Sequence, residues 1–160
     1  MSGETPRKTS ADRRALSGAA RIYAVQALFQ MEAANQSADR VVREFANWRI
    51  GVDYDEGTSP EADEDLFERI VDGAVNWQAR IDQMTDRALV AKWPIDRIDP
   101  VIRALFRAAG AELSATDTPP RVVITEYVDV AHAFFPDGRE PKFVNAVLDH
   151  MAREAMPEAF

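Results

Sequence analysis

The stretch from Asp99 to Leu113, DPVIRALFRAAGAEL, constrains the fold more than any other part of the chain. It begins with an aspartate that can accept hydrogen bonds from free helical N–H groups and with a proline at the first helical position, where a missing N–H costs nothing. Apolar residues then cover most of the helix circumference and leave no solvated face. These residues are Val101, Ile102, Leu105, Phe106, Ala108, Ala109 and Leu113. Such a helix has to lie inside, so we expect the other elements to pack around it.

Gly110 interrupts this apolar helix. A glycine inside a helix costs about 1 kcal/mol relative to alanine. Two explanations stay open, namely the close approach of a neighbouring helix and a kink at the glycine.

Helical spacing of apolar residues recurs in six further segments. We expect these helices at about residues 11–34, at 37–49, from a cap near Ser59 and Pro60 to a break near Asn76, at 77–89, from about 119 to 135, and at 141–154. The β-branched run at 122–125 could form a strand, but apolar residues continue at helical spacing to 135, which favours a helix. In the second helix we expect Val41, Val42, Phe45 and Trp48 to form the buried edge. The prediction is an all-α protein of about seven helices.

A chain of 160 residues is enough for one domain, which we place at 11–160 after a flexible basic tail at 1–10. The whole chain has a net charge of −8. Residues 1–21 carry a net charge of +3, so the remaining residues carry −11. An acidic body with a basic end fits a protein that meets an anionic partner at that end. The chain has no cysteine, no apolar leader and no membrane span, so we expect a cytoplasmic protein.

No residue pattern in the sequence indicates an enzyme, a metal site or a cofactor site. A glycine-rich phosphate loop is absent, and His132 and His150 lie too far apart to share one helix as metal ligands. Asp53 and Asp55 resemble the start of a calcium loop, but Gly57 stands where that loop needs its third oxygen ligand. We therefore expect a non-catalytic protein without metal or cofactor.

Several blocks of sequence resemble the NusB family in the same order along the chain. Residues 24–29, AVQALF, resemble its AVQALY signature, and residues 143–149, FVNAVLD, resemble its FVNGVLD. The segment 119–126 is similar to its PxxVxINE, with Thr125 in place of the Asn. Further matching positions are Trp77, Arg80-Ile81-Asp82, Trp93, Arg97-Ile98, Leu105-Phe106-Arg107 and Glu112-Leu113. The resemblance covers about residues 13–153.

The resemblance implies an all-α fold of two packed helical bundles with no catalytic activity. It also implies a transcription antitermination factor that binds boxA-type RNA together with NusE, a small-subunit ribosomal protein. In the antitermination complex, such a factor helps RNA polymerase to resist termination in ribosomal RNA transcription. The residues expected at the RNA surface are Arg7, Lys8, Arg13, Arg14, Arg21, Gln26, Phe29 and Lys142.

Arg14 and Arg21 are seven residues apart, so they share one stripe of the first helix with Gly18 between them. A cation at position 21 is hard to assign to packing, and we expect it to contact RNA. Phe29 could either stack on a base or lie in the core. If Glu112 is buried it needs a partner such as Arg107, and we expect a structural role for it.

Two alternatives to this function stay open. The surface of the first helix could mediate self-association to a homodimer, with RNA excluded from the same patch. The chain could also be the NusB-like RNA-binding domain of a ribosomal RNA methyltransferase, which would require a further domain for the methyl donor.

Overall fold

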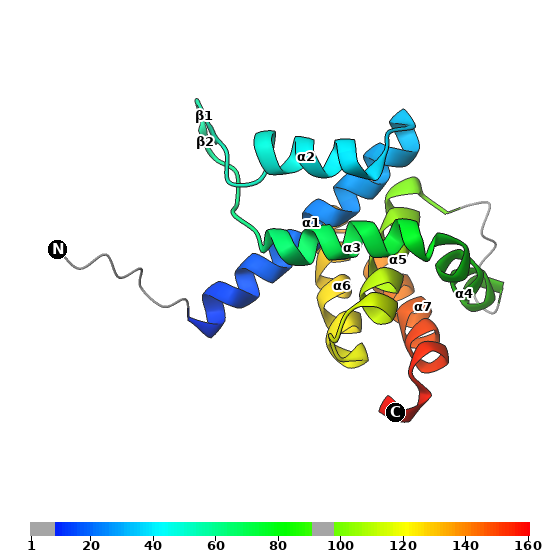
Figure 1. Cartoon of the computed structure of the whole chain (residues 1–160). Coiled ribbons are helices and arrows are strands. Elements are labelled where there is room, and N and C mark those ends of the chain that lie inside the picture. Colours follow the sequence, from blue (N-terminus) through cyan, green and yellow to red (C-terminus); the bar gives the residue numbers. More distant parts are fainter. Residues whose placement is uncertain (1–8, 91–97) are drawn as a thin grey trace.

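The computed structural model describes residues 9–90 and 98–160, so Arg7, Lys8, Trp93 and Arg97 lie outside the described residues (Figure 1). Within these ranges the chain forms seven α-helices, a two-stranded antiparallel hairpin and a short 3-10 helix, which confirms the all-α prediction. The elements are α1 (Ser10–Ala34), α2 (Ala38–Trp48), β1 (Asp53–Tyr54), β2 (Gly57–Thr58), α3 (Glu64–Asn76), α4 (Gln78–Val90), α5 (Pro100–Ala115), α6 (Pro120–Phe134), α7 (Glu140–Ala155) and η2 (Pro157–Ala159). The β-branched run at 122–125 lies in α6 and is helical.

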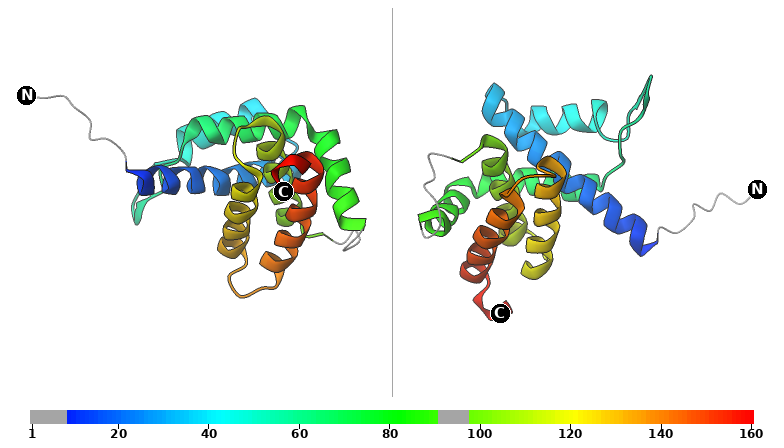
Figure 2. Two further views of the ribbon diagram at one scale, coloured as in Figure 1. Left: turned by 90° about the horizontal axis from the view of Figure 1, so that it is seen from below. Right: turned by 180° about the vertical axis from the view of Figure 1, so that it is seen from behind.

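Helix α5 lies at the centre of the molecule, as its sequence predicts. The Asp99 carboxylate accepts a hydrogen bond from the Val101 N–H at 2.7 Å, and Pro100 occupies the first helical position. Leu105 and Phe106 are completely buried. The helix packs against α1, α3, α4, α6 and α7, so nearly every other helix contacts it (Figures 1 and 2).

Gly110 permits a close contact between α5 and α4. A Cβ atom added there would overlap Cγ2 of Ile81, which α4 places against the backbone of α5. The close-approach explanation of this glycine is therefore confirmed.

The other helices form two groups that share α5. Helices α1, α2 and α3 pack on one another at one side, and α4, α6 and α7 pack at the other, with α6 and α7 antiparallel (Figure 2). Aromatic side chains fill the first group, where the rings of Phe45 and Phe67 stack at a centroid distance of 5.6 Å. None of the described helices is both long enough and apolar enough to cross a bilayer.

Two local predictions are wrong. Helix α3 begins at Glu64 instead of near Pro60, because the Asp63 carboxylate caps it by accepting from the Leu66 N–H at 3.0 Å. Trp48 is 75% exposed, since it is the last residue of α2 and lies beyond the edge that Val41 and Phe45 bury.

Candidate nucleic-acid interface

Helix α1 carries most of the residues that the sequence predicts for RNA. A capping box fixes its start, because the Thr9 hydroxyl accepts from the Asp12 N–H and the Asp12 carboxylate accepts from the Thr9 N–H, both at 3.0 Å. The tip of the helix projects beyond the rest of the helical body (Figure 1). Arg13 and Arg14 lie on the first turns of the helix and are exposed.

The exposed start of α1 lies beside the first turns of α6. Together they line a shallow depression of about 580 Å³, which we call the basic hollow. Its residues are Arg13, Arg14, Ser17 and Arg21 of α1 and Arg121, Val122, Thr125 and Glu126 of α6. Four arginines and one glutamate give it an excess of positive charge. Arginine binds phosphate through two parallel N–H groups, so this is the kind of surface that the RNA backbone meets.

Arg21 does not contribute a free cation to this hollow. We expected no packing role for this arginine, and that expectation is wrong. Its side chain is 6% exposed. Nε and Nη2 donate to the two carboxylate oxygens of Glu112 at 2.9 and 2.8 Å, and the Tyr127 hydroxyl donates to the same carboxylate at 3.1 Å. The arginine joins α1 to α5 and leaves no donor pair directed at a ligand.

The same contacts identify the partner of Glu112. The sequence suggested Arg107, but Arg107 binds Asp82 of α4 instead. Burial lowers the pKa of Arg21, while the hydrogen bonds and the charge of Glu112 raise it, and the net pKa is raised. Burial and the charge of Glu112 raise the pKa of Tyr127 well above its ordinary value. Arg21 therefore stays charged and Tyr127 stays protonated, as a structural site requires.

The remaining arginines of the basic hollow differ in their partners. Glu126 lies 3.6 Å from both Arg14 and Arg21, so it offsets part of their charge. Arg13 contacts the Ser10 hydroxyl at 3.5 Å. Arg121 forms no ion pair with any carboxylate in the described ranges, and its guanidinium lies over the ring of Phe160. Sequence reasoning missed Arg121, because only the fold shows that the first turn of α6 lies beside the start of α1.

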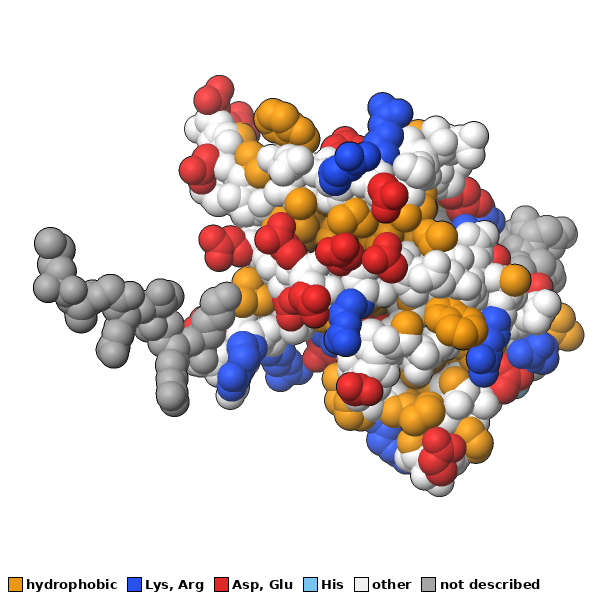
Figure 3. All heavy atoms as spheres, viewed as in Figure 1, with side chains coloured by type: hydrophobic (Ala, Val, Ile, Leu, Met, Phe, Trp, Pro, Cys, Tyr) orange, Lys and Arg blue, Asp and Glu red, His pale blue; other side chains and the backbone are white. Residues whose placement is uncertain are grey.

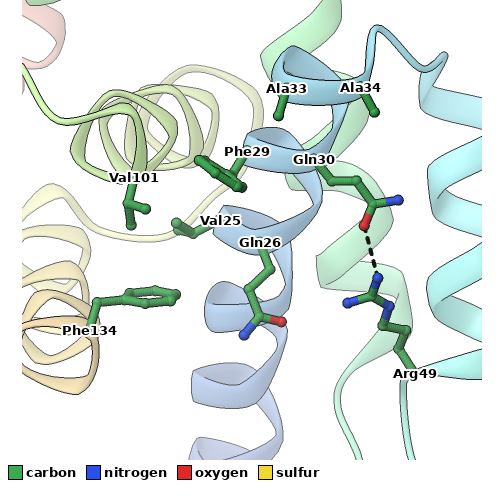
Figure 4. Close-up of a pocket in the computed structure, with 9 residues that line it drawn as sticks. All are labelled: Val25, Gln26, Phe29, Gln30, Ala33, Ala34, Arg49, Val101 and Phe134. Carbon is green, nitrogen blue, oxygen red and sulfur yellow. Dashed lines mark hydrogen bonds between the residues drawn. The ribbon is translucent and has the colours of Figure 1, made fainter.

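Gln26 and Phe29 lie further along α1, beside a second depression of about 360 Å³ (Figure 4). We call it the apolar hollow. It is lined by Val25, Gln26, Phe29, Gln30, Ala33, Ala34, Arg49, Val101 and Phe134. Phe29 is 38% exposed and its ring points toward Val101. Gln30 accepts a hydrogen bond from Arg49 at 3.0 Å, which closes one side. Phe29 therefore packs in part and leaves part of its ring exposed beside the apolar hollow.

The structure does not bring all the predicted residues together. Fifteen residues of helix separate Arg14 from Phe29, or about 22 Å along the axis. Lys142 is exposed on the first turn of α7 and lines neither hollow. The candidate interface thus has two separate parts, a basic one at Arg13 and Arg14 and an aromatic one at Phe29.

Acidic side chains dominate a different part of the surface. Figure 3 shows a row of them over α3, whereas basic side chains lie at the start of α1 and also over α2. Asp39, Glu68 and Asp72, together with Val42 and Arg43, border a groove between α2 and α3. The net negative charge along α3 repels a polyanion, which leaves the basic hollow as the more accessible surface for one. Among residues 9–90 and 98–160, no group of three acids or histidines is placed to hold a metal ion.

Comparison with known proteins gives one consistent family. Residues 18–153 match the model of the NusB family. The chain is 45% identical, over 161 aligned positions and the full length of both chains, to the transcription antitermination protein NusB of Maricaulis maris. It superposes on NusB of T. maritima with a TM-score of 0.66 at 30% identity, over 98% of each chain. A crystal structure of the antitermination factors NusB and NusE with dsRNA has the same fold, with a TM-score of 0.67 at 24% identity over 86% of this chain and 96% of that one.

Proposed function

This chain belongs to the NusB family, and from that premise we propose that it is a transcription antitermination factor that binds RNA together with NusE. It is a non-catalytic protein, like the relatives named as antitermination proteins. The RNA that we propose is a boxA-type element in nascent ribosomal RNA, and the result is an RNA polymerase complex that resists termination. A protein of the same fold in complex with NusE and dsRNA supports this choice of partners.

The observation that carries the proposal is the basic hollow on an otherwise acidic protein. Arg13, Arg14 and Arg121 present guanidinium groups at one end of a chain whose net charge is −8. Few cations and a repelling body imply weak RNA binding by the protein alone, with a steep dependence on salt. NusE is then needed to raise the affinity.

The two hollows suggest a division of roles. The arginines of the basic hollow contact the sugar–phosphate backbone and fix the position of the strand. Phe29, whose ring is partly exposed beside the apolar hollow, stacks on a base, and the Gln26 amide bonds to a base edge. Lys142 stays a predicted contact from the first turn of α7.

The test compares a boxA-like RNA oligomer with a scrambled one, with and without NusE, over a range of salt concentrations. Arg13→Glu with Arg14→Glu should abolish specific binding and leave the fold and the NusE contact intact, because both side chains are exposed. Arg40→Glu with Arg43→Glu is the matched control, since it makes the same charge change on α2 and should bind nearly as well as the wild type.

Two results would overturn the proposal. One is equal affinity for the boxA-like and scrambled RNA when NusE is present. The other is a double variant at positions 13 and 14 that keeps its RNA affinity but is a monomer, when the wild-type protein is a dimer. The second result would assign this surface to self-association.

A further inference from the structure

The ring of Phe160 lies within stacking distance of two arginines at the edge of the basic hollow. The guanidinium carbon of Arg121 is 4.7 Å from the ring centroid, and that of Arg153 is 4.5 Å away. Both distances are typical of cation–π contacts. Arg121 belongs to the first turn of α6 and Arg153 to the last turn of α7. One ring therefore joins the two helices beside the proposed RNA surface.

The ring is itself held in place. Helix η2 packs against α7, and Phe160 is half-buried against the core. Its N–H donates to the Pro157 carbonyl at 3.3 Å. Arg153 is held by a second contact besides the ring, because its Nε donates to the Asp149 carboxylate at 2.9 Å. The ring is thus a supported platform for the Arg121 side chain, which is otherwise exposed.

The ring contact decides which groups of Arg121 remain free. A cation–π contact makes no hydrogen bond to a carboxylate or carbonyl, so it leaves guanidinium N–H groups available, and these are the groups that bind phosphate oxygens. Arg121 lines the basic hollow and has no carboxylate partner within the described part of the chain. Its charge is therefore not offset, and the ring limits the directions in which it can point.

We propose that Phe160 is a positioning residue that orients Arg121 toward a backbone phosphate in the basic hollow, an inference that rests on the proposed function. A free arginine loses considerable side-chain entropy when it binds, and an arginine already held against a ring loses less. Phe160 acts only through Arg121 and does not touch the RNA.

The experiment measures the affinity of the protein with NusE for a boxA-like RNA oligomer. Phe160→Ala and Phe160→Leu should each weaken binding about two- to fivefold, the factor that an exposed cation–π contact supplies. Phe160→Tyr, which keeps the ring, should bind like the wild type. Arg121→Ala should weaken binding at least as much and lower the salt slope by about one. The double variant at 121 and 160 should bind no more weakly than Arg121→Ala.

Two further measurements separate positioning from simple damage. Met156→Ala, in the same segment, should leave RNA binding unchanged, because Met156 is exposed and takes part in neither of the two cation–π contacts. The NMR signal of the Arg121 Nε–H should show a ring-current shift in the wild type and in Phe160→Tyr, and lose it in Phe160→Leu. The shift is measured without RNA, so it tests the contact independently of the proposed function.

Several outcomes would overturn the inference. Tighter binding by Phe160→Ala would mean that the ring competes with RNA for Arg121. Wild-type affinity in Phe160→Leu, or additive losses in the double variant, would remove the positioning role even if the ring-current shift is present. In each of these cases a loss of binding in Arg13→Ala would leave the proposed function standing. If neither Arg13→Ala nor Arg121→Ala changes RNA binding, both proposals fail.

Discussion

The buried contact of Arg21, Glu112 and Tyr127 joins three helices through single side chains. The arginine comes from α1, the glutamate from α5 and the tyrosine from α6. A bidentate ion pair gives strict geometry, and the tyrosine hydroxyl uses a remaining acceptor site of the carboxylate. Removing one charge from such a pair costs more than the pair contributes, because the other charge stays buried.

We therefore predict that Arg21→Met lowers the free energy of unfolding by about 3–5 kcal/mol. Denaturant melts followed by circular dichroism measure it. The control is Arg21→Met with Glu112→Leu, which removes both charges and should recover most of the lost stability. A cost below about 1 kcal/mol for the single variant would show that water reaches the carboxylate.

The exposed pair of Arg87 and Glu154 links α4 to α7 and gives a prediction about pH. Arg87 donates to both oxygens of Glu154, at 2.6 and 3.1 Å, and this hydrogen bonding lowers the pKa of Glu154 below its usual 4.5. A carboxyl whose pKa is lowered on folding stabilises the folded state above its unfolded pKa, and this stabilisation is lost as the pH falls through the folded pKa. Arg87→Gln should therefore destabilise the protein slightly at pH 7 and not at all below the folded pKa.

Unfolding midpoints of the wild type and Arg87→Gln, compared at neutral and acidic pH, measure this difference. The difference at pH 7 should also shrink at high salt, because both side chains are accessible to solvent. A difference that persists at acidic pH would mean that Arg87 stabilises the protein by packing.

At the scale of elements, both helix groups pack against α5, and Gly110 lets Ile81 of α4 lie directly against the α5 backbone. Gly110→Ala would improve helix propensity yet force Ile81 to move. We predict a net destabilisation of about 1–3 kcal/mol, the usual cost of overpacking a core. Thermal or denaturant unfolding measures it.

Gly18 provides the matched control in α1. A Cβ atom there would meet nothing within 4 Å, so Gly18→Ala should stabilise the protein by up to about 1 kcal/mol through helix propensity alone. If Gly110→Ala is also stabilising, the approach of α4 to α5 is looser than the structure describes.

The helices were predictable because the evidence for them is local. Apolar spacing and the Asp99–Pro100 start require only neighbouring residues, and both lead to the observed α5. The start of α3 was misplaced because Pro60 is an acceptable first residue and only the Asp63 hydrogen bond decides between the two positions. Local signals thus predict that a helix exists better than where it begins.

At the scale of the whole molecule, the candidate site was only partly predictable. Arg13 and Arg14 followed from charge and from resemblance, and the structure leaves them exposed. Arg21 was misread because its partner Glu112 is 91 residues away in the sequence. Arg121 was missed because its place beside α1 depends on how α6 packs. Contacts between distant segments leave no periodic signal in a single sequence.

The basic hollow has a further consequence for the order of events during synthesis. Arg13 and Arg14 leave the ribosome first, and Arg121 follows more than one hundred residues later, with Phe160 later still. A growing chain that has made only α1 exposes its arginines among the abundant RNA of the ribosome, yet it lacks the wall that α6 contributes. The hollow that we propose for RNA is therefore complete only after α6 has been made and has packed beside α1.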